Sequence, residues 1–109
     1  WTSSPHPGLP DPGCNGAIVH YPYFGGEAGC LLFVNAADPE YRRNLTLRYS
    51  TDGGMTWSSG LVLVEGDTGY SDLAVLPSGE IAVVCERDGY TVCEVIVVAP
   101  EQIFGQCTR

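Results

Sequence analysis

The chain has 109 residues, enough for one modest hydrophobic core, and a formal net charge of −8 at pH 7. This acidic balance argues against binding to nucleic acid or to an anionic membrane surface, because both require a basic face. No apolar run approaches the ~20 residues that span a bilayer. Fourteen glycines and eight prolines interrupt short apolar segments, which favours an all-β fold over a helical one.

In chain order, residues 1–16 are rich in proline and glycine and predict an extended connector. Seven strand-like segments follow: Ala17–Tyr21, Leu31–Val34, Leu45–Ser50, Leu61–Val64, Tyr70–Leu76, Ile81–Cys85 and Val92–Ala99. Most of the turns between them carry hairpin signals, so the sequence predicts an antiparallel meander.

Two architectures fit these strands. Four strands between Ala17 and Val64 would form one β-propeller blade, whose typical length is ~40–45 residues, and the remaining three would form most of a second blade. The alternative is a compact β-sandwich of seven strands. Composition alone does not separate the two.

The five cysteines include no Cys-x-x-Cys pair, which argues against a zinc site. Cys85 and Cys93 flank a turn at 88–89 and would be close enough across a hairpin for a disulfide. Alternatively, the cysteines are buried thiols that pack as small apolar residues. His6 and His20 also lack the spacing of metal ligands, so the sequence predicts no metal site and no cofactor.

The octad Ser50–Trp57, which reads S-T-D-G-G-M-T-W, follows the third predicted strand. Asp52 can accept hydrogen bonds from its own turn, the glycines permit positive φ, and Trp57 can fold back over the turn. The pattern Ser-x-Asp-x-Gly-x-Thr-Trp resembles the Asp-box of sialidases and related β-propellers. This resemblance gives structural roles to Ser50, Asp52, Gly54 and Trp57, and it favours the propeller over the sandwich.

A second pattern follows the octad: Tyr70 opens Tyr-Ser-Asp-Leu, Pro-Ser-Gly stands at 77–79, and Glu86 ends a predicted strand. It resembles the sialidase segment that carries the nucleophilic tyrosine. The resemblance implies about two blades of the six-bladed catalytic β-propeller of an exo-α-sialidase (neuraminidase), from its C-terminal part. Residues 17–64 would then be a blade with the Asp-box, and residues 65–109 a partial closing blade and C-terminal tail.

The resemblance assigns the catalytic roles to Tyr70 and Glu86. Sialic acid carries a carboxylate on its anomeric carbon, which would repel a carboxylate nucleophile but not a neutral tyrosine. Glu86 corresponds to the family's glutamate that pairs with an arginine of the carboxylate-binding triad. The alternatives are that Tyr70 is an amphipathic strand-edge aromatic and Glu86 a solvated hairpin residue.

Arg42 resembles the third arginine of that triad. The family pattern is Arg, a variable residue, Asn or Asp, and an apolar residue that opens a strand, and Arg42 is followed by Arg43, Asn44 and Leu45. A guanidinium binds a carboxylate in a bidentate manner, which explains the use of arginine rather than lysine. Because the two arginines are adjacent, Arg43 remains an alternative, as does a plain surface role for both.

The resemblance further implies that the acid/base aspartate, the glutamate that activates the tyrosine and two triad arginines lie upstream of Trp1. We therefore expect the 109-residue chain alone to be inactive. The intact parent would be a secreted or extracellular glycoside hydrolase that cleaves sialylated glycoproteins and glycolipids. The alternative is a non-catalytic Asp-box propeller that binds glycan or protein, which would not need Tyr70 and Glu86.

Overall fold

The computed structural model describes residues 9–10, 16–38, 40–87 and 92–105. The described residues form six antiparallel strands, hydrogen-bonded in chain order: β1 (Ala17–Tyr21), β2 (Cys30–Ala36), β3 (Arg43–Ser50), β4 (Leu61–Val75), β5 (Ile81–Arg87) and β6 (Val92–Val98). The predicted all-β, antiparallel fold is therefore confirmed. Most of the predicted connector at 1–16 and the turn at 88–89 lie outside the described residues.

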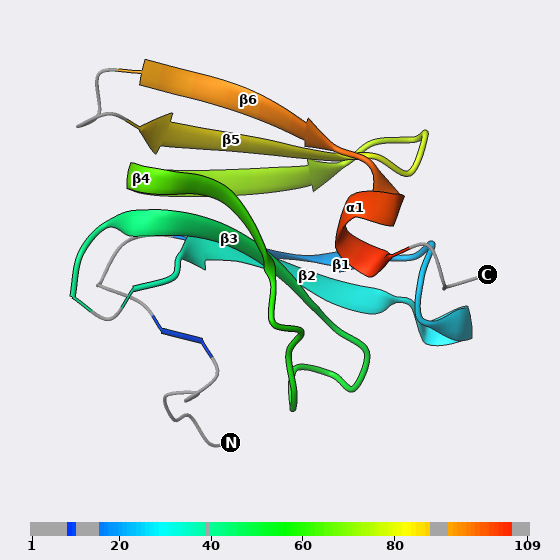
Figure 1. Ribbon diagram of the computed structural model, residues 1–109. Coiled ribbons are helices and arrows are strands. Elements are labelled where there is room, and N and C mark those ends of the chain that lie inside the picture. The colour runs from blue at the N-terminus through cyan, green and yellow to red at the C-terminus, as the bar shows by residue number, and fades with distance from the viewer. Residues whose placement is uncertain (1–8, 11–15, 39, 88–91, 106–109) are drawn as a thin grey trace.

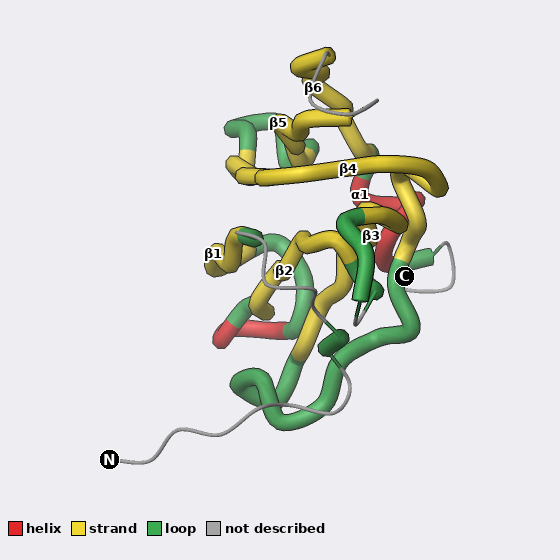
Figure 2. The backbone as a smooth tube through the Cα atoms, turned by 90° about the vertical axis from the view of Figure 1, so that its left-hand side faces the viewer, coloured by secondary structure: helices red, strands yellow, loops and turns green. Residues whose placement is uncertain are grey.

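Strand β4 is longer than its neighbours and belongs to two layers. Its first half pairs with β3, and its second half, from Thr68 to Val75, pairs with β5. Figures 1 and 2 show β1, β2 and β3 in one layer, β5 and β6 in the other, and β4 passing between them. The seven expected strands are therefore six, because the polar segment 65–69 stays extended and joins two segments that were predicted separately.

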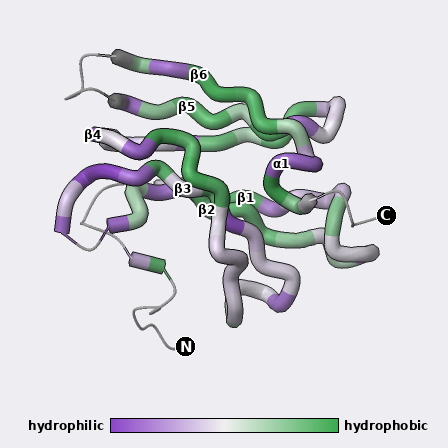
Figure 3. The backbone as a smooth tube through the Cα atoms, in the orientation of Figure 1, coloured by the Kyte–Doolittle hydropathy of each residue, from purple (hydrophilic) through white to green (hydrophobic). Residues whose placement is uncertain are grey.

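The hydrophobic core lies between the two layers. In Figure 3 the hydrophobic residues gather along the strands, and alternate positions of these strands are buried. Burying one such side chain fully stabilises the fold by about 1.5–3 kcal/mol relative to leaving it exposed. The buried cluster consists of Tyr21, Cys30, Leu32, Val34, Leu45, Leu47, Val64, Leu73, Ile81, Val83, Cys85, Val98 and Phe104.

A short helix, α1 (Pro100–Phe104), covers one end of this core (Figure 1). Proline suits its first position, and the Gln102 side chain accepts the Ala99 N–H at 2.8 Å. Phe104 is buried and stacks on Phe24, with 4.1 Å between ring centroids. A helix of five residues is too short to show a sequence period, so this segment was predicted only as a tail. No helix in the described ranges is long and apolar enough to cross a membrane.

The possible disulfide between Cys85 and Cys93 does not form, since both carry thiols. The β5–β6 register places Cys85 opposite Glu94 and Cys93 opposite Glu86, so the two cysteines are diagonal rather than directly opposed. Cys85 and Cys30 are buried, as the alternative predicted, whereas Cys93 is exposed. Burial raises the pKa of the Cys30 thiol to about 11.

Candidate active site

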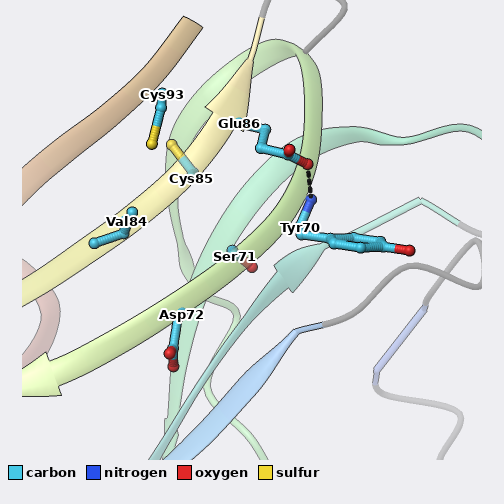
Figure 4. Close-up of a pocket in the computed structure, with 7 residues that line it drawn as sticks. All are labelled: Tyr70, Ser71, Asp72, Val84, Cys85, Glu86 and Cys93. Carbon is cyan, nitrogen blue, oxygen red and sulfur yellow. Dashed lines mark hydrogen bonds between the residues drawn. The ribbon is translucent and has the colours of Figure 1, made fainter.

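Three of the predicted site residues meet at one corner of the molecule. Arg42 precedes β3, Tyr70 lies near the middle of β4, and Glu86 lies near the end of β5. The guanidinium carbon of Arg42 is 5.6 Å from the centroid of the Tyr70 ring. The backbone N–H of Tyr70 donates to Oε1 of Glu86 at 3.1 Å (Figure 4). Strand pairing therefore brings together three residues that are far apart in the sequence.

A β-bulge positions Tyr70 at this corner. The β4–β5 register shifts by one residue between Thr68 and Ser71, so that Gly69 and Tyr70 both lie opposite Glu86. Such a bulge bends its strand and changes the direction of the side chains near it, and bulges are frequent next to active sites. Gly69 is buried, whereas the Tyr70 side chain is 50% exposed. The phenol is therefore accessible while the backbone behind it is packed.

Thr68 connects the strands that carry the three residues. It is 2% exposed, and its hydroxyl donates to the Glu86 carbonyl at 3.0 Å. Its backbone N–H donates to the Arg42 carbonyl at 2.9 Å. Sequence reasoning missed this residue, because a threonine in a strand carries no local signal that distinguishes it from other β-branched residues.

The two adjacent arginines have different surroundings. Arg43 donates through Nε to Oδ2 of Asp38 at 2.7 Å. Asp38 also accepts two nearby backbone N–H groups at 2.9 Å each. Those backbone bonds, followed by the Arg43 guanidinium, lower the pKa of Asp38 to about 2. Arg43, the first residue of β3, is thus bonded to the loop before that strand, whereas Arg42 lies against Tyr70.

A hollow of about 240 Å³ lies beside Tyr70 and Glu86 (Figure 4). This is smaller than the roughly 300–1,000 Å³ of typical ligand pockets, and Arg42 does not line it. The hydroxyl of Ser71, in its wall, is buried and has no hydrogen-bond partner within the described residues. The lining residues are Tyr70, Ser71, Asp72, Val84, Cys85, Glu86 and Cys93. In the part of the chain that the structure describes, no group of three or more His, Cys, Asp or Glu side chains could hold a metal ion.

The Ser50–Trp57 turn lies at the other end of β3 from Arg42, roughly 25 Å away at the usual rise of an extended strand. The Ser50 hydroxyl donates to Oδ1 of Asp52 at 2.7 Å and accepts the Gly54 N–H at 2.9 Å. Thr56 donates its hydroxyl and its N–H to the same carboxylate. The Thr56 bonds, followed by that of Ser50, lower the pKa of Asp52 to about 2. Nε1 of Trp57 donates to the Gly54 carbonyl at 3.0 Å, so the indole folds back over the turn.

The arrangement of the strands is that of consecutive β-propeller blades. Strands β1 to β3 and the first half of β4 form a four-stranded antiparallel unit. The second half of β4 then begins a further antiparallel unit with β5 and β6. Radial repetition of four-stranded antiparallel sheets defines the propeller class.

Comparisons with known proteins show what the chain resembles. No protein-family model matches the chain. The chain is 38% identical over 82 residues, 72% of its length, to a sialidase of Micromonospora viridifaciens. It is 41% identical over 62 residues, 53% of its length, to sialidases of two Vibrio cholerae serotype O1 strains. Among solved structures it resembles the Hadza microbial sialidase Hz136, with a TM-score of 0.73 and 26% identity over 85% of this chain.

The chain therefore resembles a segment of sialidases, which confirms the resemblance predicted from its sequence. It spans 13% of the Micromonospora relative, 8% of the Vibrio relatives and 19% of the solved sialidase chain.

Proposed function

We propose that this chain forms part of the active site of a retaining exo-α-sialidase, which removes terminal sialic acids from glycoproteins and glycolipids. The observation that carries the proposal is the approach of Arg42 to Tyr70, with Glu86 bonded to the Tyr70 backbone. The similarity to sialidases supports the substrate class. The small hollow beside Tyr70 fits a site whose remaining walls come from other parts of a larger propeller.

In this proposal, Tyr70 is the nucleophile and Arg42 binds the substrate carboxylate. The phenol gives its proton to a carboxylate outside these 109 residues, and its oxygen attacks the anomeric carbon. The bond to the leaving sugar oxygen breaks as an acid, also outside these residues, protonates that oxygen. Water then attacks the same carbon and displaces the tyrosine, so two inversions give net retention. The guanidinium holds the carboxylate by charge-assisted hydrogen bonds while the carbon reacts.

We assign Glu86 to holding Tyr70 through the backbone bond to Oε1. A carboxylate has a second oxygen, which we assign to a triad arginine supplied by another part of the protein. The second triad arginine, the acid/base aspartate and the carboxylate that activates Tyr70 are likewise assigned outside this chain. The isolated chain should therefore have no sialidase activity.

We assign the Ser50–Trp57 turn as an Asp-box with a structural role. Its polar groups bond to one another, and it lies at the end of β3 that is remote from Arg42. It should therefore contribute to folding and not to the chemistry.

Replacing the nucleophile in the longest natural form of the protein tests the proposal. Tyr70→Phe should lower turnover of an aryl sialoside by about 1,000-fold or more, because only the hydroxyl is lost. The circular dichroism spectrum and melting temperature should not change. Tyr23→Phe is the matched control, since Tyr23 is similarly exposed but lies on the segment after β1.

Near-normal turnover by Tyr70→Phe would refute the assignment of the nucleophile. A wild-type protein that binds sialylated glycans but releases no sialic acid would instead support a non-catalytic Asp-box propeller.

A further inference from the structure

We infer that Thr68 is a positioning residue of this site, whose hydroxyl fixes the Tyr70 bulge through Glu86. The inference rests on the function proposed above. It concerns a buried residue that touches neither the proposed substrate carboxylate position nor the reacting hydroxyl, and that acts only through its neighbours.

The hydrogen bonds at the bulge depart from those of a regular ladder. Directly opposed residues of an antiparallel pair either exchange two backbone N–H···O=C bonds or face each other without them. Here the Tyr70 N–H donates to the carboxylate of Glu86 at 3.1 Å, and the Glu86 carbonyl accepts the Thr68 hydroxyl at 3.0 Å. Two side chains have therefore taken over bonds that backbone groups make elsewhere in the sheet.

The Thr68 hydroxyl maintains this pattern of two side-chain hydrogen bonds. Thr68 is 2% exposed, so water does not readily replace its hydroxyl as the donor to the Glu86 carbonyl. Without that donor the carbonyl needs another, and the two bulge residues opposite Glu86, Gly69 and Tyr70, each carry a backbone N–H that can donate to it. We expect the Tyr70 N–H to take this place. Tyr70 would then leave the Glu86 carboxylate, and its ring would move relative to Arg42. A displacement of about 1 Å at a reacting group can lower the rate about 100-fold.

Thr68 also bonds to Arg42, and this bond does not depend on the Thr68 side chain. The bond to the Arg42 carbonyl uses the backbone N–H of Thr68, which any residue except proline would keep. Loss of the hydroxyl should therefore disturb Tyr70 and Glu86 while Arg42 stays in place. In kinetic terms, kcat per folded molecule should fall and KM should change little, which is the pattern of an interaction that acts in the transition state rather than in substrate binding.

The test compares Thr68→Val with Thr68→Ser in the longest natural form of the protein, with an aryl sialoside as substrate. Valine keeps the shape and removes the hydroxyl, whereas serine keeps the hydroxyl. We expect Thr68→Val to lower kcat about 10- to 100-fold with KM within about 3-fold, and Thr68→Ser to stay within about 3-fold of wild type in both. Amide hydrogen exchange at Tyr70 should change only in Thr68→Val, because the N–H then leaves the Glu86 carboxylate.

Thr46→Val is the matched control. Thr46 is 3% exposed and donates its hydroxyl to the Asn44 carbonyl at 2.8 Å, so the variant removes a bond of the same kind without touching Glu86. It should lower the melting temperature and leave kcat and the Tyr70 amide unchanged. If Thr68→Val does not fold, Thr68→Ala replaces it in the comparison with serine.

Wild-type kcat and wild-type Tyr70 exchange in folded Thr68→Val would overturn the inference. Equal losses in the valine and serine variants would overturn it as well, because shape rather than the hydroxyl would then matter. A wild-type protein without sialidase activity would refute the proposed function instead. Tyr70 exchange would still decide, in that case, whether Thr68 holds the bulge.

Discussion

The two ends of strand β3 carry polar clusters that are built in opposite ways. At its C-terminal end, the Ser50–Trp57 turn bonds its carboxylate, hydroxyl and indole groups to one another within a single octad. At its N-terminal end, Arg42 meets Tyr70 of β4 and, through it, Glu86 of β5. The first cluster is local and self-contained, whereas the second exists only when three strands pair in one register.

We therefore expect the Ser50–Trp57 turn to affect the stability of the protein and the cluster at Arg42 to affect its chemistry. A local network holds its own turn and can lose a member without moving groups at the far end of β3. In a cluster assembled across strands, backbone pairing sets the positions of the reactive side chains, so small changes of register alter its function. Variants at the two ends should therefore differ in which property they change.

The largest effect in this comparison is expected for the two adjacent arginines. Arg42→Ala should weaken binding of sialic acid, and of its planar unsaturated analogue, by about 10- to 100-fold, because it removes charge-assisted bonds to the carboxylate. Arg43→Ala should change binding by less than about 3-fold, since Arg43 contacts Asp38. Calorimetric titration or inhibition constants in the longest natural form of the protein measure both. Equal losses, or a larger loss for Arg43→Ala, would show that the assignment of Arg42 is wrong.

The same contrast explains how much the sequence revealed about the fold. The predicted segment Ala17–Tyr21 coincides with β1, and the other predicted segments fall within or close to observed strands. The main difference is β4, where the polar, glycine-containing segment 65–69 has the composition of a connector. Its extended path depends on partners in β3 and β5, which local composition does not encode.

The candidate site likewise has features that the sequence predicted and features that it did not. The sequence placed Arg42, Tyr70 and Glu86 in a common site only through resemblance to a family, since nothing local links them. It did not indicate that Glu86 bonds the Tyr70 backbone or that Thr68 lies between β3 and β5. Those contacts follow from a one-residue shift in strand register, which a single sequence does not display.

A smaller effect, on stability alone, is expected at the Ser50–Trp57 turn. Trp57 is partly buried, contacts Phe33 with 5.8 Å between ring centroids, and bonds the Gly54 carbonyl. Trp57→Ala should lower the free energy of unfolding by about 1–3 kcal/mol, less than the ~3–5 kcal/mol of a fully buried aromatic. Met55→Ala, at a 76% exposed position of the same turn, should have no measurable effect.

Denaturant unfolding and turnover per folded molecule measure these two variants. Activity should stay within about 2-fold of wild type in both. Loss of turnover in Trp57→Ala at unchanged stability would mean that the turn takes part in the chemistry, against the division drawn between the two ends of β3.

The smallest effect concerns the pH dependence of the same turn. The pKa of Asp52 is lowered to about 2, first by the Thr56 hydroxyl and N–H and then by Ser50. A carboxyl whose folded pKa is below its unfolded value of about 3.9 stabilises the fold above that value, and this contribution is lost as the pH falls toward 2. Asp38, in the loop before β3, has a pKa lowered to about 2 as well, so its contribution to stability is lost over the same pH range. The wild-type protein should therefore lose stability between about pH 4 and pH 2.

Asp52→Asn isolates the part of this loss of stability at low pH that is due to the Ser50–Trp57 turn. Its melting temperature should lie below that of wild type at pH 7, and the difference should shrink as the pH falls from about 4 toward 2, because wild type then loses the same charge. Thr56→Val should give a smaller difference of the same sign, since it removes the donor that lowers the Asp52 pKa most. Melting curves recorded between pH 2 and pH 7 would decide the matter. A difference that stays constant across that range would show that the Asp52 side chain supports the turn through its shape and not through its charge.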